Sequence, residues 1–155
     1  RQERRTLQLA TVDEEGRPNV SYAPFVQNQE GYFILISDIA RHARNLKANP
    51  QVSLMMIEDE ESSKQLYARK RLTFDAQASV VERETELWTQ VICQMQERFG
   101  EIIDGLSQLQ DFSLFNLKAE NGLFVKGFGQ AYQVSGDDLV DFVHLQEGHK
   151  KVSNE

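Results

Sequence analysis

The sequence predicts a mostly β fold, in which a small antiparallel barrel carries helices at its ends. The first half of the chain divides into short runs of aliphatic and aromatic residues, separated by turns that contain Gly, Pro and Asn. Two longer segments instead show the 3–4-residue spacing of apolar residues that is typical of amphipathic helices. Many short strands combined with two or three helices indicate this architecture.

The first half of the chain contains four predicted strands. They are Thr6–Val12, Val20–Val26, Tyr32–Ile36 and Val52–Ile57. Residues 14–19 (EEGRPN) form the first turn, because Gly and Pro interrupt regular structure there. Residues 38–50 (DIARHARNLKANP) change to helical spacing, and Pro50 lies just past the predicted end of that helix. The apolar run VSLMMI predicts that the fourth strand is buried on both faces.

The second half begins with a charged loop at residues 58–65 (EDEESSKQ) and a long strand over Leu66–Val81. In that strand apolar residues share one face, and Arg69 and Arg71 share the other. Residues Glu84–Phe99 carry the apolar stripe of a helix. The remaining predicted elements are two closing strands and a short last helix in SGDDLVDF that is N-capped by Ser135. The two strands are Phe112–Val125 and Phe128–Val134.

The composition restricts the functional class. With 155 residues, 40% of them hydrophobic, we expect a single domain over residues 1–155, with a tail at about residues 144–155. A formal net charge of −7 argues against broad binding of nucleic acids or anionic membranes. One cysteine, Cys93, cannot form a disulfide within the chain. No signal peptide is recognisable and no apolar run approaches a membrane span, so we expect a cytoplasmic location.

Three features are candidates for a binding site. Arg69 and Arg71 would lie about 7 Å apart on a strand face, which suits an anionic ligand, although an exposed face with surface ion pairs is an equal alternative. His42, between Arg41 and Arg44, is more simply interpreted as a solvent-facing helix residue than as a ligand contact. His149 follows a glycine in the polar ending LQEGHKKVSNE, where composition alone predicts a solvated side chain.

Other conspicuous residues are interpreted as structural. Cys93 lies within the helical stripe and is predicted to be a packed core thiol. The glycines of GFG at 127–129 indicate a bulge or tight corner between strands, and His144 is predicted to be half-buried beside the last helix. The four acids at 58–61 indicate a solvated loop rather than a metal site. The chain contains no phosphate-binding loop, no GxGxxG motif and no Cys/His cluster with zinc spacing.

Longer segments resemble a known family. SDIARHARNLKANPQVSLMMIED and ARKRLTFDAQA resemble the helix-then-strand segment and the following strand of the flavin-type split barrels, the superfamily of pyridoxamine-phosphate oxidase. DFSLFNLKAENGLFVKGFGQAYQV, together with the histidine of EGHKK, resembles the haem-utilisation proteins of the HugZ/HutZ group. The resemblance covers nearly the whole chain.

That resemblance implies an FMN-binding-type split β-barrel with antiparallel Greek-key strands. It implies a homodimer that binds haem between protomers instead of FMN, opens the porphyrin oxidatively and releases iron for iron acquisition. The reaction would need O2 and an external electron donor, and a haem-delivery protein is a further expected partner. A non-catalytic haem carrier or store of the same fold is the main alternative. An FMN-dependent oxidoreductase is a lesser one.

On the proximal side of the haem, the resemblance implies a role for the tail. His149 matches the position of the axial ligand of the haem iron, and Lys150 is placed to approach a propionate. Asp111, directly before the FSLF strand, is the expected acceptor of the second N–H of His149, which would orient the imidazole. Without the resemblance, Asp111 would be an ordinary loop acid.

On the distal side, the resemblance implies a role for the basic strand. Arg71 is the expected hydrogen-bond donor near bound oxygen, because a guanidinium is a permanent donor. Arg69 is expected to act in the same way or to hold a propionate. His42 is the next candidate for a haem contact, should His149 not be the ligand.

Overall fold

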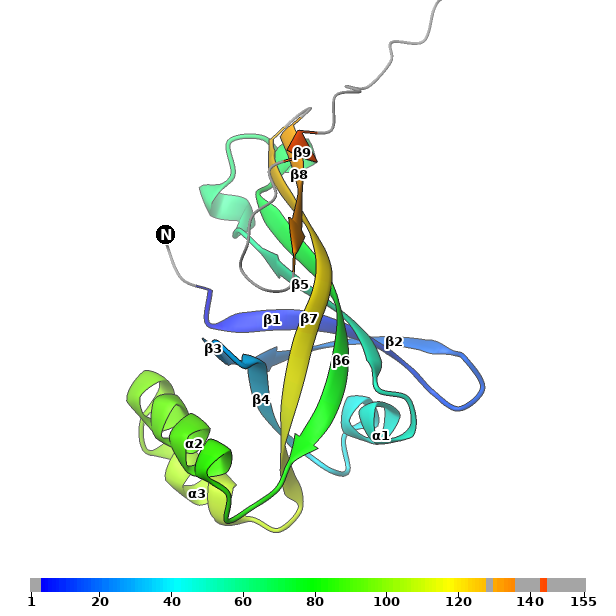
Figure 1. Cartoon of the computed structure of the whole chain (residues 1–155). Helices are drawn as coiled ribbons and strands as arrows, with labels where there is room; N and C mark the ends of the chain where they lie inside the picture. Colours follow the sequence, from blue (N-terminus) through cyan, green and yellow to red (C-terminus); the bar gives the residue numbers. More distant parts are fainter. Residues whose placement is uncertain (1–3, 128–129, 136–142, 145–155) are drawn as a thin grey trace, which may run out of the picture.

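A computed structural model describes residues 4–127, 130–135 and 143–144, and from residue 124 onward only the backbone. Nine strands of these residues form one sheet, accompanied by three α-helices (Figure 1). The strands are β1 (Thr6–Val12), β2 (Pro18–Pro24), β3 (Val26–Asn28), β4 (Gly31–Ser37), β5 (Gln51–Ile57), β6 (Arg71–Val81), β7 (Phe112–Gly127), β8 (Gln130–Ser135) and β9 (Val143–His144). The helices are α1 (Arg41–Ala48), α2 (Glu86–Phe99) and α3 (Ile102–Gln108), with single 3-10 turns η1 (Glu60–Ser62) and η2 (Leu66–Ala68).

The sheet is antiparallel and curls into a half-barrel, so the predicted fold class is confirmed. Its order is β2-β1-β5-β6-β7-β4-β3, with β8 beside β7 and β9 beside β8. The 16-residue strand β7 organises the molecule, because β6 follows one of its edges while β4 and β8 share the other. In Figure 1, β1 and β2 cross β6 and β7 steeply, as expected for a strongly twisted sheet.

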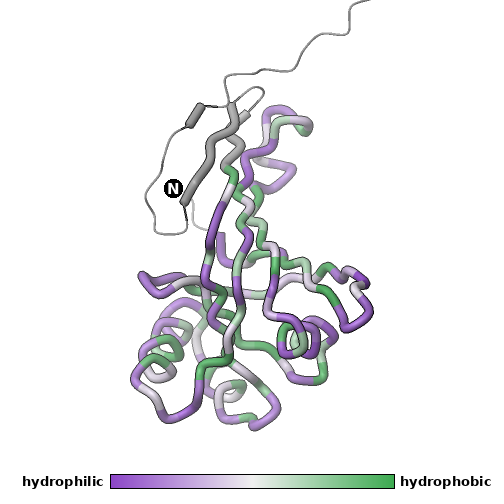
Figure 2. Tube along the Cα trace, turned by 45° about the vertical axis from the view of Figure 1, so that its right-hand side comes forward, coloured by the Kyte–Doolittle hydropathy of each residue, from purple (hydrophilic) through white to green (hydrophobic). Residues whose placement is uncertain are grey.

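Two hydrophobic cores lie on the two faces of this sheet. The concave side is filled from β1, β4, β5, β6 and β7, and α1 closes it with Ala43 and Leu46. On the outer side, α2 and α3 cover the part formed by β4 and the beginning of β7. Along the chain, hydrophobic and hydrophilic residues alternate in the strands, and hydrophilic residues dominate the turns (Figure 2). Because α1 lies on the concave side, only α2 and α3 cover the outer face, and they cover one part of it.

Several predicted elements are confirmed. Thr6–Val12 is a strand with the predicted bounds, and the helix before Pro50 and the strand after it are present. Helix α2 begins at Glu86, because the Thr85 side chain accepts a hydrogen bond from the Trp88 N–H and caps it. The predicted bulge near the GFG segment is present as a register shift between Val125 and Gly127. Residues 128 and 129 lie outside the described part of the chain.

Other predictions are wrong in their bounds. The predicted strand Val20–Val26 is divided, because β2 ends at Pro24 and β3 begins at Val26 on the edge of β4. The long strand begins at Arg71 instead of Leu66, since residues 66–68 form η2. Helix α3 was not predicted, as seven residues are too few to show a clear period.

Predictions of burial also needed correction. In β5 only Val52 and Leu54 are buried, because no helix covers the other face of that strand. Cys93 is exposed, since the helical period directs Val91 and Met95 into the core and Cys93 away from it.

In the carboxyl-terminal part, His144 belongs to strand β9 and pairs with Tyr132. The predicted position of its side chain beside a last helix lies outside what the structure describes. Ser135 is the last residue of β8, and the helix predicted after it would occupy residues 136–142, outside the described residues. Within the described residues, no helix is long and apolar enough to cross a membrane.

Candidate functional site

The part of the outer sheet face that the helices leave uncovered is formed by β2, β1, β5, β6 and the far half of β7. Paired residues of neighbouring strands point to the same side of a sheet, so the register identifies its members. We call this surface the open sheet face, and its residues include Ala10, Val20, Tyr22, Met55, Ile57, Arg71, Thr73 and Leu123. Val20 is 76% and Tyr22 67% exposed. The same register also places Gln8, Ser53 and Asp75 on this face, so the exposed apolar side chains lie beside polar ones. Exposed apolar side chains rimmed by polar residues suit a binding or association site.

Arg71 provides the positive charge of the open sheet face. It is half-buried at the start of β6, and its Nη1 donates to the carbonyl oxygen of Arg69 at 3.3 Å. Among the described residues, no carboxylate forms an ion pair with this guanidinium. Most of its five donors are therefore available to an anionic or oxygen-containing ligand.

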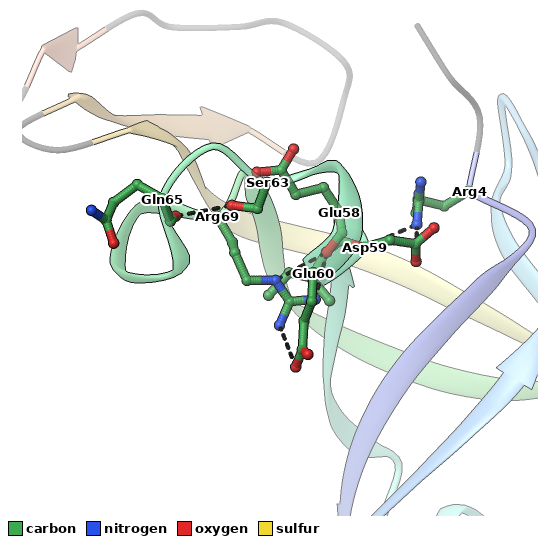
Figure 3. A network of polar contacts seen from close by, with 8 residues as sticks. Arg4, Glu58, Asp59, Glu60, Ser63, Gln65 and Arg69 are labelled. Atoms are coloured by element: carbon green, nitrogen blue, oxygen red, sulfur yellow. Dashed lines mark hydrogen bonds and ion pairs between the residues drawn. The ribbon is translucent and has the colours of Figure 1, made fainter.

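Arg69 is engaged in a different way. Because the strand begins only at Arg71, the two arginines do not share a strand face, which corrects the sequence prediction. The Arg69 side chain turns to the acidic loop, where its Nε donates to the carbonyl oxygen of Glu58 at 3.1 Å (Figure 3). Its Nη1 lies 3.8 Å from the Glu60 carboxylate. Arg69 therefore stabilises the loop that leads into β6.

The acidic loop at 58–61 is held by cations and backbone groups. Glu58 accepts the N–H of Lys70 at 2.8 Å. Asp59 accepts a hydrogen bond from Arg4 at 2.9 Å (Figure 3). Within the described residues, no group of three or more His, Cys, Asp or Glu side chains is arranged to hold a metal ion. The prediction of a charged loop is confirmed.

His42 is less exposed than the sequence predicted. It lies on α1 and is half-buried, and burial lowers the pKa of its imidazole below the ordinary value of 6.5. The cause is desolvation, which disfavours the charged form. The neutral imidazole has one nitrogen free to accept a hydrogen bond or bind a metal.

Asp111 occupies the turn between α3 and β7, and its side chain is exposed. Its carbonyl oxygen accepts the N–H of Asp38 at 2.7 Å. No described residue bonds to or pairs with its carboxylate. Asp38 in turn accepts a hydrogen bond from the Ser113 hydroxyl at 2.6 Å, which is the main reason why the pKa of Asp38 is lowered. Asp38 and Ser113 carry no recognisable signal in the sequence, because their contact joins segments 75 residues apart.

The ligand predicted in the tail is outside the described residues, as are Gly148 and Lys150. The backbone nevertheless shows from where the tail departs. Strand β9 pairs with β8 at the end of the molecule opposite the turn of Asp111 (Figure 1). The turn with Asp111 and the origin of the tail are thus separated by most of the length of β7.

Comparison with known proteins finds relatives over the whole chain. The family model of pyridoxamine 5′-phosphate oxidase matches residues 1–126. The haem oxygenase HutZ of Vibrio cholerae is 82% identical over 154 residues, which cover 99% of this chain and 88% of that protein.

Two solved structures are also similar. The crystal structure of HutZ from Vibrio cholerae, described as a haem storage protein, has a TM-score of 0.78 and 81% identity, covering 83% of this chain and 90% of that one. The crystal structure of ChuZ from Campylobacter jejuni has a TM-score of 0.83 and 35% identity, covering 96% of this chain and 61% of that one.

Proposed function

The chain belongs to the pyridoxamine 5′-phosphate oxidase family and, within it, to the HutZ group, and from this premise we propose that it binds haem and opens the porphyrin oxidatively. The reaction uses O2 and an external electron donor, and it releases iron for iron acquisition. The observation that carries this proposal is the 82% identity with haem oxygenase HutZ, which extends over 99% of the chain. A haem-delivery protein and a cytoplasmic location remain part of the proposal.

The open sheet face supports haem as the ligand. Haem is a broad apolar plate with two propionates at one edge, so its site needs apolar contacts and a cation. Met55, Ile57 and Leu123 provide apolar side chains beside the guanidinium of Arg71, which forms no ion pair within the described part of the chain. We assign to Arg71 the role of donor at the distal side of the haem. Arg69 is a weaker candidate for a propionate, because the acidic loop already engages it.

His149 is proposed as the axial ligand of the iron, with Lys150 near a propionate. Bound haem supplies the iron that activates O2, while the protein orients the imidazole. The exposed Asp111 carboxylate is proposed to accept the second N–H of His149, which makes the ligand a stronger electron donor. His42, which burial keeps neutral, is the next candidate for a haem contact.

A second copy of the chain is proposed to complete the site. The tail departs at one end of β7 and Asp111 lies at the other, so His149 of one protomer is expected to meet Asp111 of its partner (Figure 1). The exposed Val20 and Tyr22 support association through the open sheet face. A closed two-fold arrangement would then create two equivalent sites between the protomers.

Haem storage is the second candidate, because the crystal structure of HutZ carries that description. Storage and degradation need the same ligand, so the fold does not distinguish them. FMN-dependent chemistry is the least favoured, because the two HutZ comparisons are named for haem oxygenation and haem storage.

The test is an absorption titration with hemin, followed by ascorbate in air. Degradation predicts a Soret band at stoichiometric hemin that bleaches with reductant, together with ferrous iron detected by a chelator. A Soret band that persists would establish storage, and flavin bands in the purified protein would establish the third candidate.

The assignment of the ligand is tested by His149→Ala, with Gln146→Ala in the same tail as the matched control. We expect His149→Ala to lose the wild-type Soret spectrum and turnover while the barrel remains folded, because a polar tail contributes little to a core. Gln146→Ala should behave as wild type. Wild-type haem spectra and haem loss in His149→Ala would disprove the assignment and turn attention to His42.

A further inference from the structure

One arginine from a distant segment, Arg83, forms hydrogen bonds to both sides of the turn that carries Asp111. Arg83 follows β6 in sequence, near the end of the molecule at which β7 begins (Figure 1). We propose that Arg83 is a positioning residue for Asp111, which fixes the turn so that its carboxylate is presented to the haem-ligating histidine of a partner. This inference rests on the proposed function of Asp111.

The hydrogen bonds of the Arg83 side chain all reach the turn or its boundaries. Its Nη1 donates to the carbonyl oxygen of Ser107 at 2.6 Å, and its Nη2 donates to those of Leu109 and Phe112 at 2.6 and 2.8 Å. These carbonyls belong to the last turn of α3, to its C-cap residue and to the first residue of β7. The guanidinium also lies 4.4 Å from the centre of the Trp88 ring, which restricts its orientation.

A planar fork is required for this arrangement. Three carbonyl oxygens that converge from both ends of a turn can be satisfied together by a guanidinium, whose donors diverge in fixed directions. A lysine would offer its charge from one atom and would not hold all three in one geometry. The bonds therefore lock the backbone on both sides of Asp111.

A second set of contacts fixes the backbone of Asp111 itself. The N–H of Asp38 donates to the Asp111 carbonyl oxygen at 2.7 Å, and the Asp38 carboxylate is held by Ser113 at 2.6 Å and by Lys47 at 3.0 Å. The carbonyls of Leu109, Asp111 and Phe112 are thus occupied, while the Asp111 carboxylate has no partner among the described residues. This combination of a fixed backbone and an unengaged carboxylate is what a pre-organised acceptor requires.

A purely structural role for Arg83, as a clamp for the end of α3, predicts a different outcome. It would lower stability when removed, but it would leave the bond between iron and histidine unchanged. A positioning role predicts that loss of Arg83 reproduces the spectroscopic effect of Asp111→Asn. The two can therefore be separated by a measurement at the iron.

The first measurement uses the full-length protein without haem. Hydrogen exchange of the backbone amides at residues 107–113 should accelerate at least about tenfold in Arg83→Gln, because the side-chain bonds that hold the turn are lost. Arg17→Gln, on the exposed turn between β1 and β2, is the control and should leave that segment unchanged. Unchanged exchange at residues 107–113 in Arg83→Gln would overturn the proposed clamp, whatever the protein binds.

The second measurement uses the haem complex. The iron–histidine stretch in resonance Raman spectra of the ferrous form should shift in Arg83→Gln in the same direction as in Asp111→Asn. Turnover should fall by about tenfold or more, in the range seen for partners of metal ligands. Arg83→Lys should show the same changes in stretch and turnover as Arg83→Gln, since lysine lacks the planar guanidinium. A wild-type stretch and turnover in Arg83→Lys would show that the positive charge alone is sufficient, and this would overturn the proposal.

The double variant Arg83→Gln with Asp111→Asn provides the decisive comparison. If Arg83 acts through Asp111, the double variant should show the stretch of Asp111→Asn with no further shift. A wild-type stretch in Arg83→Gln, alongside a shifted stretch in Asp111→Asn, would reject the positioning role and leave the proposed function intact. A wild-type stretch in Asp111→Asn would reject the role of Asp111 and this inference with it.

Should Arg83→Gln fail to fold, Ser113→Ala tests the same turn from its other side. This variant removes one hydrogen bond to Asp38 and keeps the clamp of Arg83. A smaller shift of the iron–histidine stretch in the same direction is expected. A wild-type stretch in Ser113→Ala would count against positioning by this network.

Discussion

Mixing two defective protomers is expected to restore one complete haem site. In His149→Ala the ligand is lost, and in Asp111→Asn the proposed acceptor is lost. If each site takes His149 from one protomer and Asp111 from the other, a heterodimer of the two variants contains one site with both native residues and one with neither. If both residues come from the same protomer, no site in the heterodimer is complete.

The structure indicates which outcome to expect. His144 pairs with Tyr132 of β8, and Tyr132 pairs with Phe124 of β7. Phe124 lies roughly thirteen residues along the chain from Asp111. At ~3.3 Å per residue this separation is about 40 Å. The five residues from His144 to His149 span at most about 18 Å when fully extended. Even with about 10 Å for the two side chains, a shortfall of more than about 10 Å remains within one chain.

The assay is turnover of hemin by purified heterodimers that carry a different affinity tag on each protomer. We expect about half of the wild-type turnover per dimer, and a ferrous iron–histidine stretch that contains the wild-type component, because one of two equivalent sites is restored. Each homodimeric variant is its own control. Turnover equal to the mean of the two parents, without the wild-type stretch, would refute pairing between protomers.

Three further perturbations test the structure directly. In Gly122→Ala, a new Cβ would lie 2.3 Å from the Phe74 ring. Urea denaturation should show that the free energy of unfolding falls by about 1–3 kcal/mol. Gly105→Ala, which has open space around the new Cβ, should lose no stability. Equal stabilities of the two variants would contradict the close contact at Gly122. Because the pKa of Asp38 is lowered in the folded protein, its carboxylate stabilises the fold above the unfolded pKa near 3.8. This contribution to the free energy of unfolding is lost as the pH falls through the lower pKa of the folded state. Denaturation of Asp38→Asn should therefore depend less on pH below about 4 than in the wild type, and identical slopes would disprove the effect. Burial lowers the pKa of His42, so stability should decline as the pH falls below about 6.5, and His42→Gln should lack that part of the decline.

Local patterns predicted the elements that are defined by one regular spacing of apolar residues or by one turn-forming or capping residue. Thr6–Val12 alternates between buried and exposed side chains along its length, and α2 follows its apolar stripe from a threonine cap. The charged loop was predicted because four consecutive acids cannot enter a core without partners. In these cases the preference of each short segment agrees with its place in the fold.

Prediction failed where neighbours distant in sequence determine the result. The other face of β5 is partly exposed only because α2 and α3 cover a different part of the sheet. The two arginines predicted on one strand face are separated because residues 66–68 form a 3-10 turn whose C-cap is Arg69. Cys93 was placed correctly in a helix and incorrectly in its core, since the direction of the buried stripe depends on what the helix packs against.

The candidate site divides in the same way. The sequence by itself determined the fold class, the family and the residue types that can ligate haem, because these follow from local pattern and from motifs that can be read along one chain. Only the tertiary structure decided that no described carboxylate pairs with Arg71, that Asp38 and Arg83 hold the turn of Asp111, and that this turn lies far from the origin of the tail. Those relations depend on strand register and on contacts between segments tens of residues apart, which no local pattern encodes.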